Sequence, residues 1–103
     1  MQMIKLLSHD IRENIHEARE KIGEAYKLHD KDKATADWYR DMAAAHLRFN
    51  DAGHQNVARL IDEVRHKPDA SPLTPGMLAV YEDMHADIIR ENAEVQAMIA
   101  AYK

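Results

Sequence analysis

A chain of 103 residues, 46% of them hydrophobic, is long enough for one domain and too apolar for an intrinsically disordered segment. The net charge of −4 argues against a nucleic-acid partner, whose phosphates require a basic surface. The absence of cysteine excludes disulfides, thiolate metal sites and cysteine nucleophiles. No apolar run approaches the length of a membrane-spanning helix, so we expect a cytoplasmic protein without a membrane partner.

The composition favours an all-α fold. Only three glycines and three prolines interrupt a chain rich in residues that favour helices. We predict one domain, 1–103, made of three long helices at about 8–29, 34–65 and 74–102. Three helices of this length bury a modest core by themselves, so we also expect a homodimer.

The first helix is predicted from an apolar stripe that recurs at helical spacing. Its members are Ile4, Leu7, Ile11, Ile15, Ala18, Ile22 and Ala25. Ser8 is a suitable N-cap for this helix, with the alternative that the apolar residues before it already pack. The mixed cluster 29–33 then predicts a short turn, so the second helix should return antiparallel to the first.

The second helix is predicted to bury a stripe that contains most of the large apolar residues of the segment. This stripe comprises Trp38 with Tyr39, Met42, His46, Phe49, Gly53, Val57, Leu60 and Val64. Gly53 lowers helix stability by about 1 kcal/mol relative to alanine. Its presence indicates either the close approach of another backbone or a mild bend in the helix. After a proline-containing linker, Thr74 as N-cap and Pro75 at the first helical position begin the third helix.

The third helix carries a regular seam in which steps of three and four residues alternate, as in packed helices. The seam runs through Leu78, Tyr81, His85, Ile88, Asn92, Val95, Ile99 and Tyr102. His85 and Asn92 cannot be buried there without partners. These polar groups therefore either specify the helix register or hold a ligand.

Two of the seven histidines, His46 and His85, occupy seam positions. His9, His29 and His66 fall at helix ends or turns, and His16 and His54 fall beside the stripes, where partial exposure is expected. One interpretation makes the two seam histidines core residues, hydrogen-bonded across helices to Asn14, Asn92, Tyr39 or Tyr81. The other joins them to a carboxylate of the first helix.

In that second interpretation, Glu17, His46 and His85 form a metal site between facing helices. Oxygen and nitrogen ligands of this kind suit iron, manganese or zinc. The spacing Glu-x-x-His, which places two ligands on one helix face, occurs at Glu13 with His16 and at Glu82 with His85. In the second helix the same spacing from His46 leads to Phe49, which cannot ligate a metal.

The chain resembles a group of small ferritin-like proteins of bacteria and their phages. The residues that carry the resemblance are Met77–His85, Ala93–Met98, Tyr102, Lys103, Trp38, Tyr39, His54, Val57, Leu60 and Ile61. The resemblance implies a helical hairpin and a third helix, with two copies completing a ferritin-like antiparallel bundle. In metal-binding relatives, a glutamate of the first helix and Glu-x-x-His of the second hold two iron ions. These positions correspond here to Glu17, His46 and Phe49, so one ligand is changed in type and another is lost.

Two main functions remain open at this point. The first is a structural or interaction protein on a ferritin-like scaffold with a degenerate metal site, without a catalytic residue. The alternative is a metal-binding bundle with a remade Glu/His site, related to oxidation or storage. An adaptor that binds a helix of another protein is a third possibility, which would fit a monomeric chain.

Overall fold

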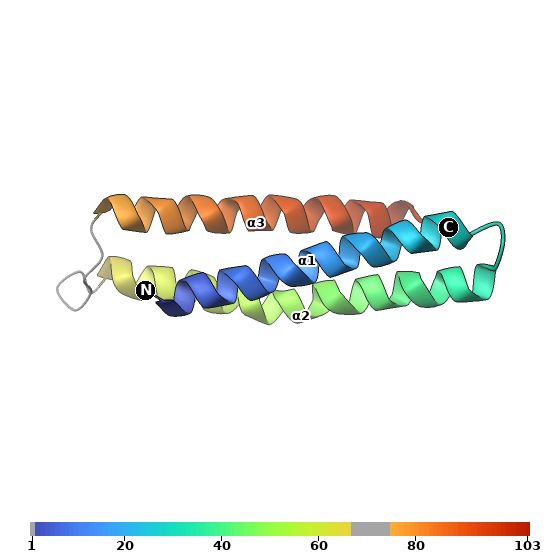
Figure 1. The fold of residues 1–103 in the computed structure, drawn as a ribbon. Helices are drawn as coiled ribbons and strands as arrows, with labels where there is room; N and C mark the ends of the chain where they lie inside the picture. Colours follow the sequence, from blue (N-terminus) through green and yellow to red (C-terminus); the bar gives the residue numbers. More distant parts are fainter. Residues whose placement is uncertain (1, 67–74) are drawn as a thin grey trace.

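The computed structural model describes residues 2–66 and 75–103, and this part of the chain forms three α-helices and no strand. The helices are α1 (Gln2–Leu28), α2 (Lys33–His66) and α3 (Pro75–Ala101). Successive helices run in opposite directions and form a rod of 58 × 17 × 17 Å (Figure 1). The predicted all-α bundle is therefore confirmed.

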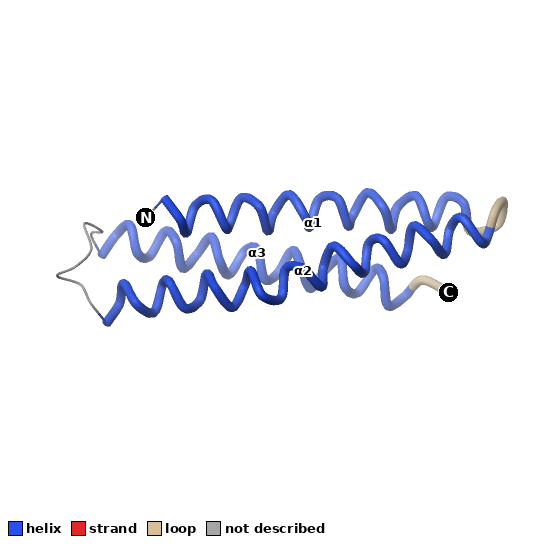
Figure 2. The backbone as a smooth tube through the Cα atoms, turned by 90° about the horizontal axis from the view of Figure 1, so that it is seen from below, coloured by secondary structure: helices blue, strands red, loops and turns tan. Residues whose placement is uncertain are grey.

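The packing of the three helices is unequal. The contact between α1 and α2 is the most extensive, and α3 lies along both of them with smaller contacts (Figure 2). The C-terminus lies beside the turn between α1 and α2, whereas α1 begins at the other end of the rod (Figure 1). None of the described helices combines the length and apolarity that crossing a membrane requires.

The start of α1 differs from the prediction. The helix begins at Gln2, and Ser8 lies inside it with 2% of its surface exposed, so the assignment of Ser8 as N-cap is wrong. The reason is that Ile4, which is fully buried, already belongs to the core and extends the helix toward the N-terminus. The predicted cap Thr74 lies outside the described residues, and α3 begins at Pro75.

The predicted turn is present and is closed by an aspartate. The backbone N–H groups of Lys31 and Asp32 donate to the Leu28 carbonyl at 3.0 and 2.8 Å. The Asp32 carboxylate accepts hydrogen bonds from the Thr35 N–H at 3.1 Å and the Thr35 hydroxyl at 2.6 Å. These bonds lower the pKa of Asp32 and cap the beginning of α2.

The predicted stripes of α1 and α3 form the core, together with the predicted Val57, Leu60 and Val64 of α2 and a different face of the N-terminal half of that helix. Buried members from α1 and α3 include Ile4, Ile11, Ile15, Ile22, Tyr81, Ile88, Val95 and Tyr102. From α2 the buried residues are Ala36, Ala43, Leu47, Asn50, Val57, Leu60, Ile61 and Val64.

The N-terminal half of the α2 stripe was therefore assigned to the wrong face. Trp38 and Phe49 are 56% and 78% exposed, and Ala36 and Ala43 are buried in their stead. Alanine has no bulk beyond Cβ, so its burial allows α1 and α2 to pack closely, whereas large aromatic rings would hold them apart. The size of the aromatic side chains, which dominated the sequence pattern, keeps them out of this interface.

Gly53 lies against the side chain of Ile11 in α1. A Cβ atom added at Gly53 would lie 3.0 Å from Cγ1 and 3.1 Å from Cδ1 of Ile11. The glycine thus makes room for the Ile11 side chain of α1, whereas the sequence analysis expected another backbone or a bend at this position.

Candidate functional site

A layer of polar side chains crosses the middle of the apolar core and joins all three helices. The Asn14 amide of α1 donates to Asn50 Oδ1 of α2 at 3.2 Å, and Asn14 Oδ1 lies 3.3 Å from His46 Nδ1. Asn50 Nδ2 in turn donates to Asn92 Oδ1 of α3 at 3.2 Å and to the Ile11 carbonyl at 3.3 Å. Asn50 and Asn92 are both buried. A hydrogen-bonded layer of this kind favours one register of the helices over its alternatives.

A pair of histidines lies next to this layer, between α2 and α3. The rings of His54 and His85 have centroids 5.7 Å apart and planes inclined by 33°. Both residues are partly buried. Both ring nitrogens of His54 and Nε2 of His85 are buried, and among the described residues they form no hydrogen bond of ordinary geometry, although the Asn92 side chain lies near His54. The pair thus departs from the usual pattern in which buried polar atoms are hydrogen-bonded.

The environment of this pair favours neutral imidazoles. Desolvation lowers the pKa of His54, although Asn92 and the Asp51 carboxylate counter part of this effect. Desolvation also lowers the pKa of His85, and proximity to His54 lowers it further. Neutral imidazole is the form that accepts hydrogen bonds and ligates metal ions.

The three predicted metal ligands do not meet within one chain. Glu17 is exposed on α1, 3.9 Å from Lys21, while His46 bonds to Asn14 and His85 faces His54. Across residues 2–66 and 75–103, no group of three or more histidine, cysteine or acidic residues is arranged to hold a metal ion. The assignment of Glu17, His46 and His85 as ligands stays a prediction, whereas the predicted bond between His46 and Asn14 is present.

The sequence analysis missed two members of the site, Asn50 and His54. Asn50 follows the exposed Phe49, and the erroneous assignment of Phe49 to the core placed Asn50 outside it. The signal that could have found both residues is the spacing 36, 43, 47, 50, 54 and 57 in α2, which is as regular as the chosen stripe.

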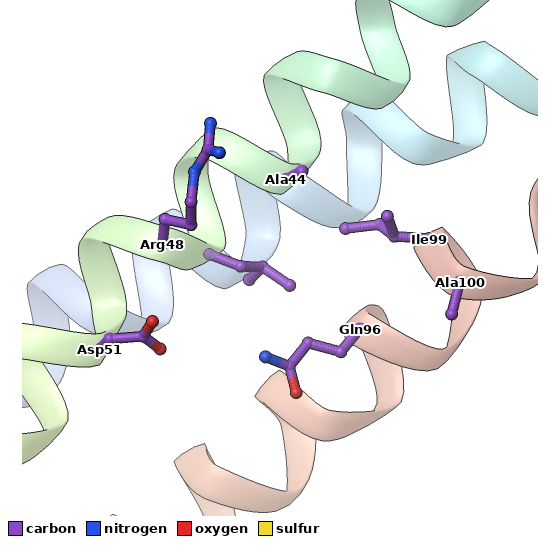
Figure 3. A pocket seen from close by; sticks show the side chains of 7 residues that line it. Ala44, Arg48, Asp51, Gln96, Ile99 and Ala100 are labelled. Atoms are coloured by element: carbon purple, nitrogen blue, oxygen red, sulfur yellow. The ribbon is translucent and has the colours of Figure 1, made fainter.

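A shallow pocket of about 210 Å³ separates α2 from α3 on another side of the bundle (Figure 3). Its apolar lining comes from Ala44, Leu47, Ile99 and Ala100. Asp51 and Gln96 extend toward each other from the two helices at one end, while Arg48 turns away (Figure 3). The pocket shows that α3 packs incompletely against α2, and it contains no catalytic arrangement of side chains.

Comparison of the chain with protein-family models, with curated proteins and with solved structures found no match. Its chemistry must therefore be argued from its own residues. Their arrangement offers an exposed apolar helix face, a register-setting polar layer and a pair of imidazoles.

Proposed function

We propose that the protein is a self-associating structural or interaction protein on a ferritin-like scaffold, and that α2 supplies the surface by which two copies bind. The observation that carries this proposal is an apolar seam on the outside of α2. It contains Trp38, Met42, Ala45, Phe49 and Ala52, in steps of four, three, four and three residues. This set is called the outer seam below.

The outer seam has the periodicity of a helix that packs against another helix, yet its largest side chains face solvent. Phe49 and Trp38 are the most exposed aromatic residues of α2, and Met42 and Ala45 beside them are partly buried. Single exposed apolar residues are ordinary on protein surfaces, but an ordered exposed seam is typical of an interaction site. Aromatic residues are also the side chains that most often dominate binding energy.

The charges beside the outer seam favour a second copy of the chain as its partner. Asp41 and Arg48 flank the same edge of the seam, seven residues apart, and both are exposed. If two α2 helices pack antiparallel about an axis near residue 44, Asp41 of each copy lies opposite Arg48 of the other. The same packing places Trp38 opposite Phe49 and Met42 opposite Ala45 in the seam, with Asp41 and Arg48 offset by two residues at its edge. A two-fold interface of this kind is self-complementary in charge and in apolar surface.

The ferritin-like part of the proposal is supported by the antiparallel hairpin with a third helix, and the degenerate metal site by the presence of Phe49. By the resemblance described above, Phe49 replaces a histidine that binds metal in relatives. Its ring is exposed on the outer seam, where it serves association rather than ligation. The scaffold would then retain the bundle and lose the di-iron centre.

Sedimentation velocity of the wild-type chain and of Phe49→Glu tests this function. We expect a dimer for the wild type and a monomer of unchanged helicity for Phe49→Glu, because burying the new carboxylate at a symmetric interface is costly. Ile89→Glu, at a residue of α3 that is 50% exposed, is the matched control and should remain dimeric.

Charge exchange then tests the proposed register. Arg48→Glu should weaken the dimer, and the double variant Asp41→Arg/Arg48→Glu should restore it. A monomeric wild type would overturn the proposal and favour a different protein as the partner of the outer seam. A Phe49→Glu variant that stays dimeric would also overturn the proposal.

A further inference from the structure

The pair of imidazoles between α2 and α3 has a geometry that suits a shared ion. In zinc sites the metal lies about 2.1 Å from an imidazole nitrogen and therefore roughly 3.2 Å from the ring centroid. Two rings that share one ion can thus have centroids up to roughly 6.4 Å apart. The observed separation of 5.7 Å between His54 and His85 falls within this limit.

The hydrogen bonding of the two rings also favours a shared ion. Three of their four nitrogens are buried and form no hydrogen bond of ordinary geometry within the described part of the chain, although the Asn92 side chain lies close enough to His54 to raise its pKa. Leaving such atoms unsatisfied costs free energy, and coordination of a cation would satisfy one nitrogen on each ring. Exposed histidines elsewhere differ in this respect, since His9 and His66 lie 4.0 and 3.3 Å from carboxylate oxygens of Glu13 and Asp62.

A solvent-open pocket reaches one member of the pair. The pocket measures about 320 Å³ and is lined by Ala58, Ile61, Asp62, Arg65, Glu82 and His85. It gives an ion and its water ligands a route to His85. Glu82 lies one helical turn before His85, and its carboxylate accepts a hydrogen bond from Arg65 at 2.7 Å.

We propose that His54 and His85 together bind one divalent transition-metal ion of the borderline class, Zn²⁺, Ni²⁺ or Cu²⁺, and thereby join α3 to α2. Imidazole suits these metals, and water from the pocket completes the coordination. The contacts of α3 with α1 and α2 are smaller than the contact between α1 and α2. An ion that joins α3 to α2 would therefore stabilise the fold rather than perform catalysis.

This site differs from the ligand set predicted from the sequence and does not depend on dimerisation. It replaces Glu17 and His46 by His54, whose ring faces His85 directly. Because both imidazoles belong to one chain, the monomeric variant Phe49→Glu should bind the ion as the wild type does. Failure of the dimer proposal and failure of the metal proposal are therefore distinguishable.

Calorimetric titration of tag-free, metal-free protein with Zn²⁺ tests the proposal. At pH 7.5 we expect one ion per chain and a higher melting temperature in its presence. Binding should weaken about tenfold or more at pH 5.5, because protonated imidazole cannot ligate. His54→Gln and His85→Gln should each lose tenfold or more in affinity, and imidazole NMR signals of these two residues should shift first in the wild type.

His66→Gln is the matched control, since His66 is exposed and forms an i,i+4 pair with Asp62 near the same pocket. It should keep the wild-type affinity. Circular dichroism of each variant without metal establishes that it folds. The proposal is overturned if the wild type takes up no Zn²⁺, Ni²⁺ or Cu²⁺. It is equally overturned if His54→Gln and His85→Gln both keep the wild-type affinity, and loss of binding in His66→Gln would then assign the uptake to exposed surface pairs.

Discussion

The hydroxyl of Tyr102 donates a hydrogen bond of 2.7 Å to the carboxylate of Asp37 and so fixes the end of the chain to the start of α2. Lys33 Nζ completes the cluster, 2.6 Å from Asp37 Oδ1 and 3.0 Å from the Lys103 carbonyl. The Tyr102 ring also packs edge-on against Tyr26 and His29, at centroid distances of 5.6 and 5.5 Å. Residues 65 or more positions apart thus hold the last turn of α3 at the α1–α2 turn.

Tyr102→Phe tests the contribution of the hydroxyl, because phenylalanine keeps the ring and removes only its hydrogen bonds. We expect a lower melting temperature and a higher pKa for Asp37. The pKa of Asp37 lies below its usual value because Lys33 and then Tyr102 bond to its charged form. Losing one of these two donors should move the pKa part of the way back.

The measurement is an NMR titration of the Asp37 carboxyl carbon in both proteins. Tyr26→Phe is the control, because it removes a hydrogen bond of 2.7 Å to the Met98 carbonyl and leaves Asp37 untouched. An unchanged Asp37 pKa in Tyr102→Phe would show that the hydroxyl does not contribute to this cluster in solution.

The regular parts of this fold could be predicted from the sequence, because the apolar stripes of α1 and α3 have one dominant periodicity. In α2 two stripes compete, one with Trp38 and Phe49 and one with Ala36, Ala43 and Leu47. Hydrophobicity alone favours burial of the first stripe in the core. Close packing against α1 favours burial of the second, because its side chains are smaller. Periodicity alone cannot decide this, since the outcome depends on the shape of the partner helix.

The same ambiguity determined which site residues could be predicted. His85 and Asn92 could be identified because α3 has only one apolar stripe. Asn14 was among the hydrogen-bond partners that the sequence predicted for His46. Asn50 and His54 belong to the α2 stripe that the sequence analysis did not predict, so only some members of the polar layer and of the histidine pair could be named from the sequence. The burial of a polar residue next to a large apolar one can be predicted only when it is known which face of the helix lies against the core.

The stability of the fold should fall as the pH decreases from 6.5, and the histidine pair should be a cause. The pKa values of His54 and His85 in the folded chain lie below the ordinary 6.5. Above pH 6.5 both histidines are neutral in the folded and unfolded chains and contribute no pH dependence. Below it the unfolded chain binds protons first, so the free energy of unfolding declines until the pH passes the folded pKa values.

Urea denaturation of metal-free protein at pH 7.5 and 5.5 measures this effect. The double variant His54→Gln/His85→Gln should lose less stability between these pH values than the wild type, whereas His16→Gln, at an exposed residue of α1, should match the wild type. Asp32 and Asp37 have pKa values below 3.8, so their contributions are lost only at lower pH and do not enter this range. An equal loss in all three proteins would show that the pair is not the source.

Gly23 and Gly53 provide a paired test of how closely α1 and α2 pack. Both lie inside helices, where alanine is favoured over glycine by about 1 kcal/mol. A Cβ atom at Gly23 would meet nothing within 4 Å, so Gly23→Ala should stabilise the fold by about that amount. At Gly53 the same atom would lie 3.0 Å from Ile11, and overpacking of a core costs about 1–3 kcal/mol.

Gly53→Ala should therefore be neutral or destabilising, in contrast to Gly23→Ala. Combining Gly53→Ala with Ile11→Val, which removes the Cδ1 atom 3.1 Å from the added Cβ, should recover part of the loss. A double-mutant cycle from urea denaturation gives this coupling directly, and Gly23→Ala with Ile11→Val should show none. If Gly53→Ala instead stabilised the protein as much as Gly23→Ala does, α1 and α2 would be able to move apart without loss, and the close approach at Ile11 would not constrain the bundle.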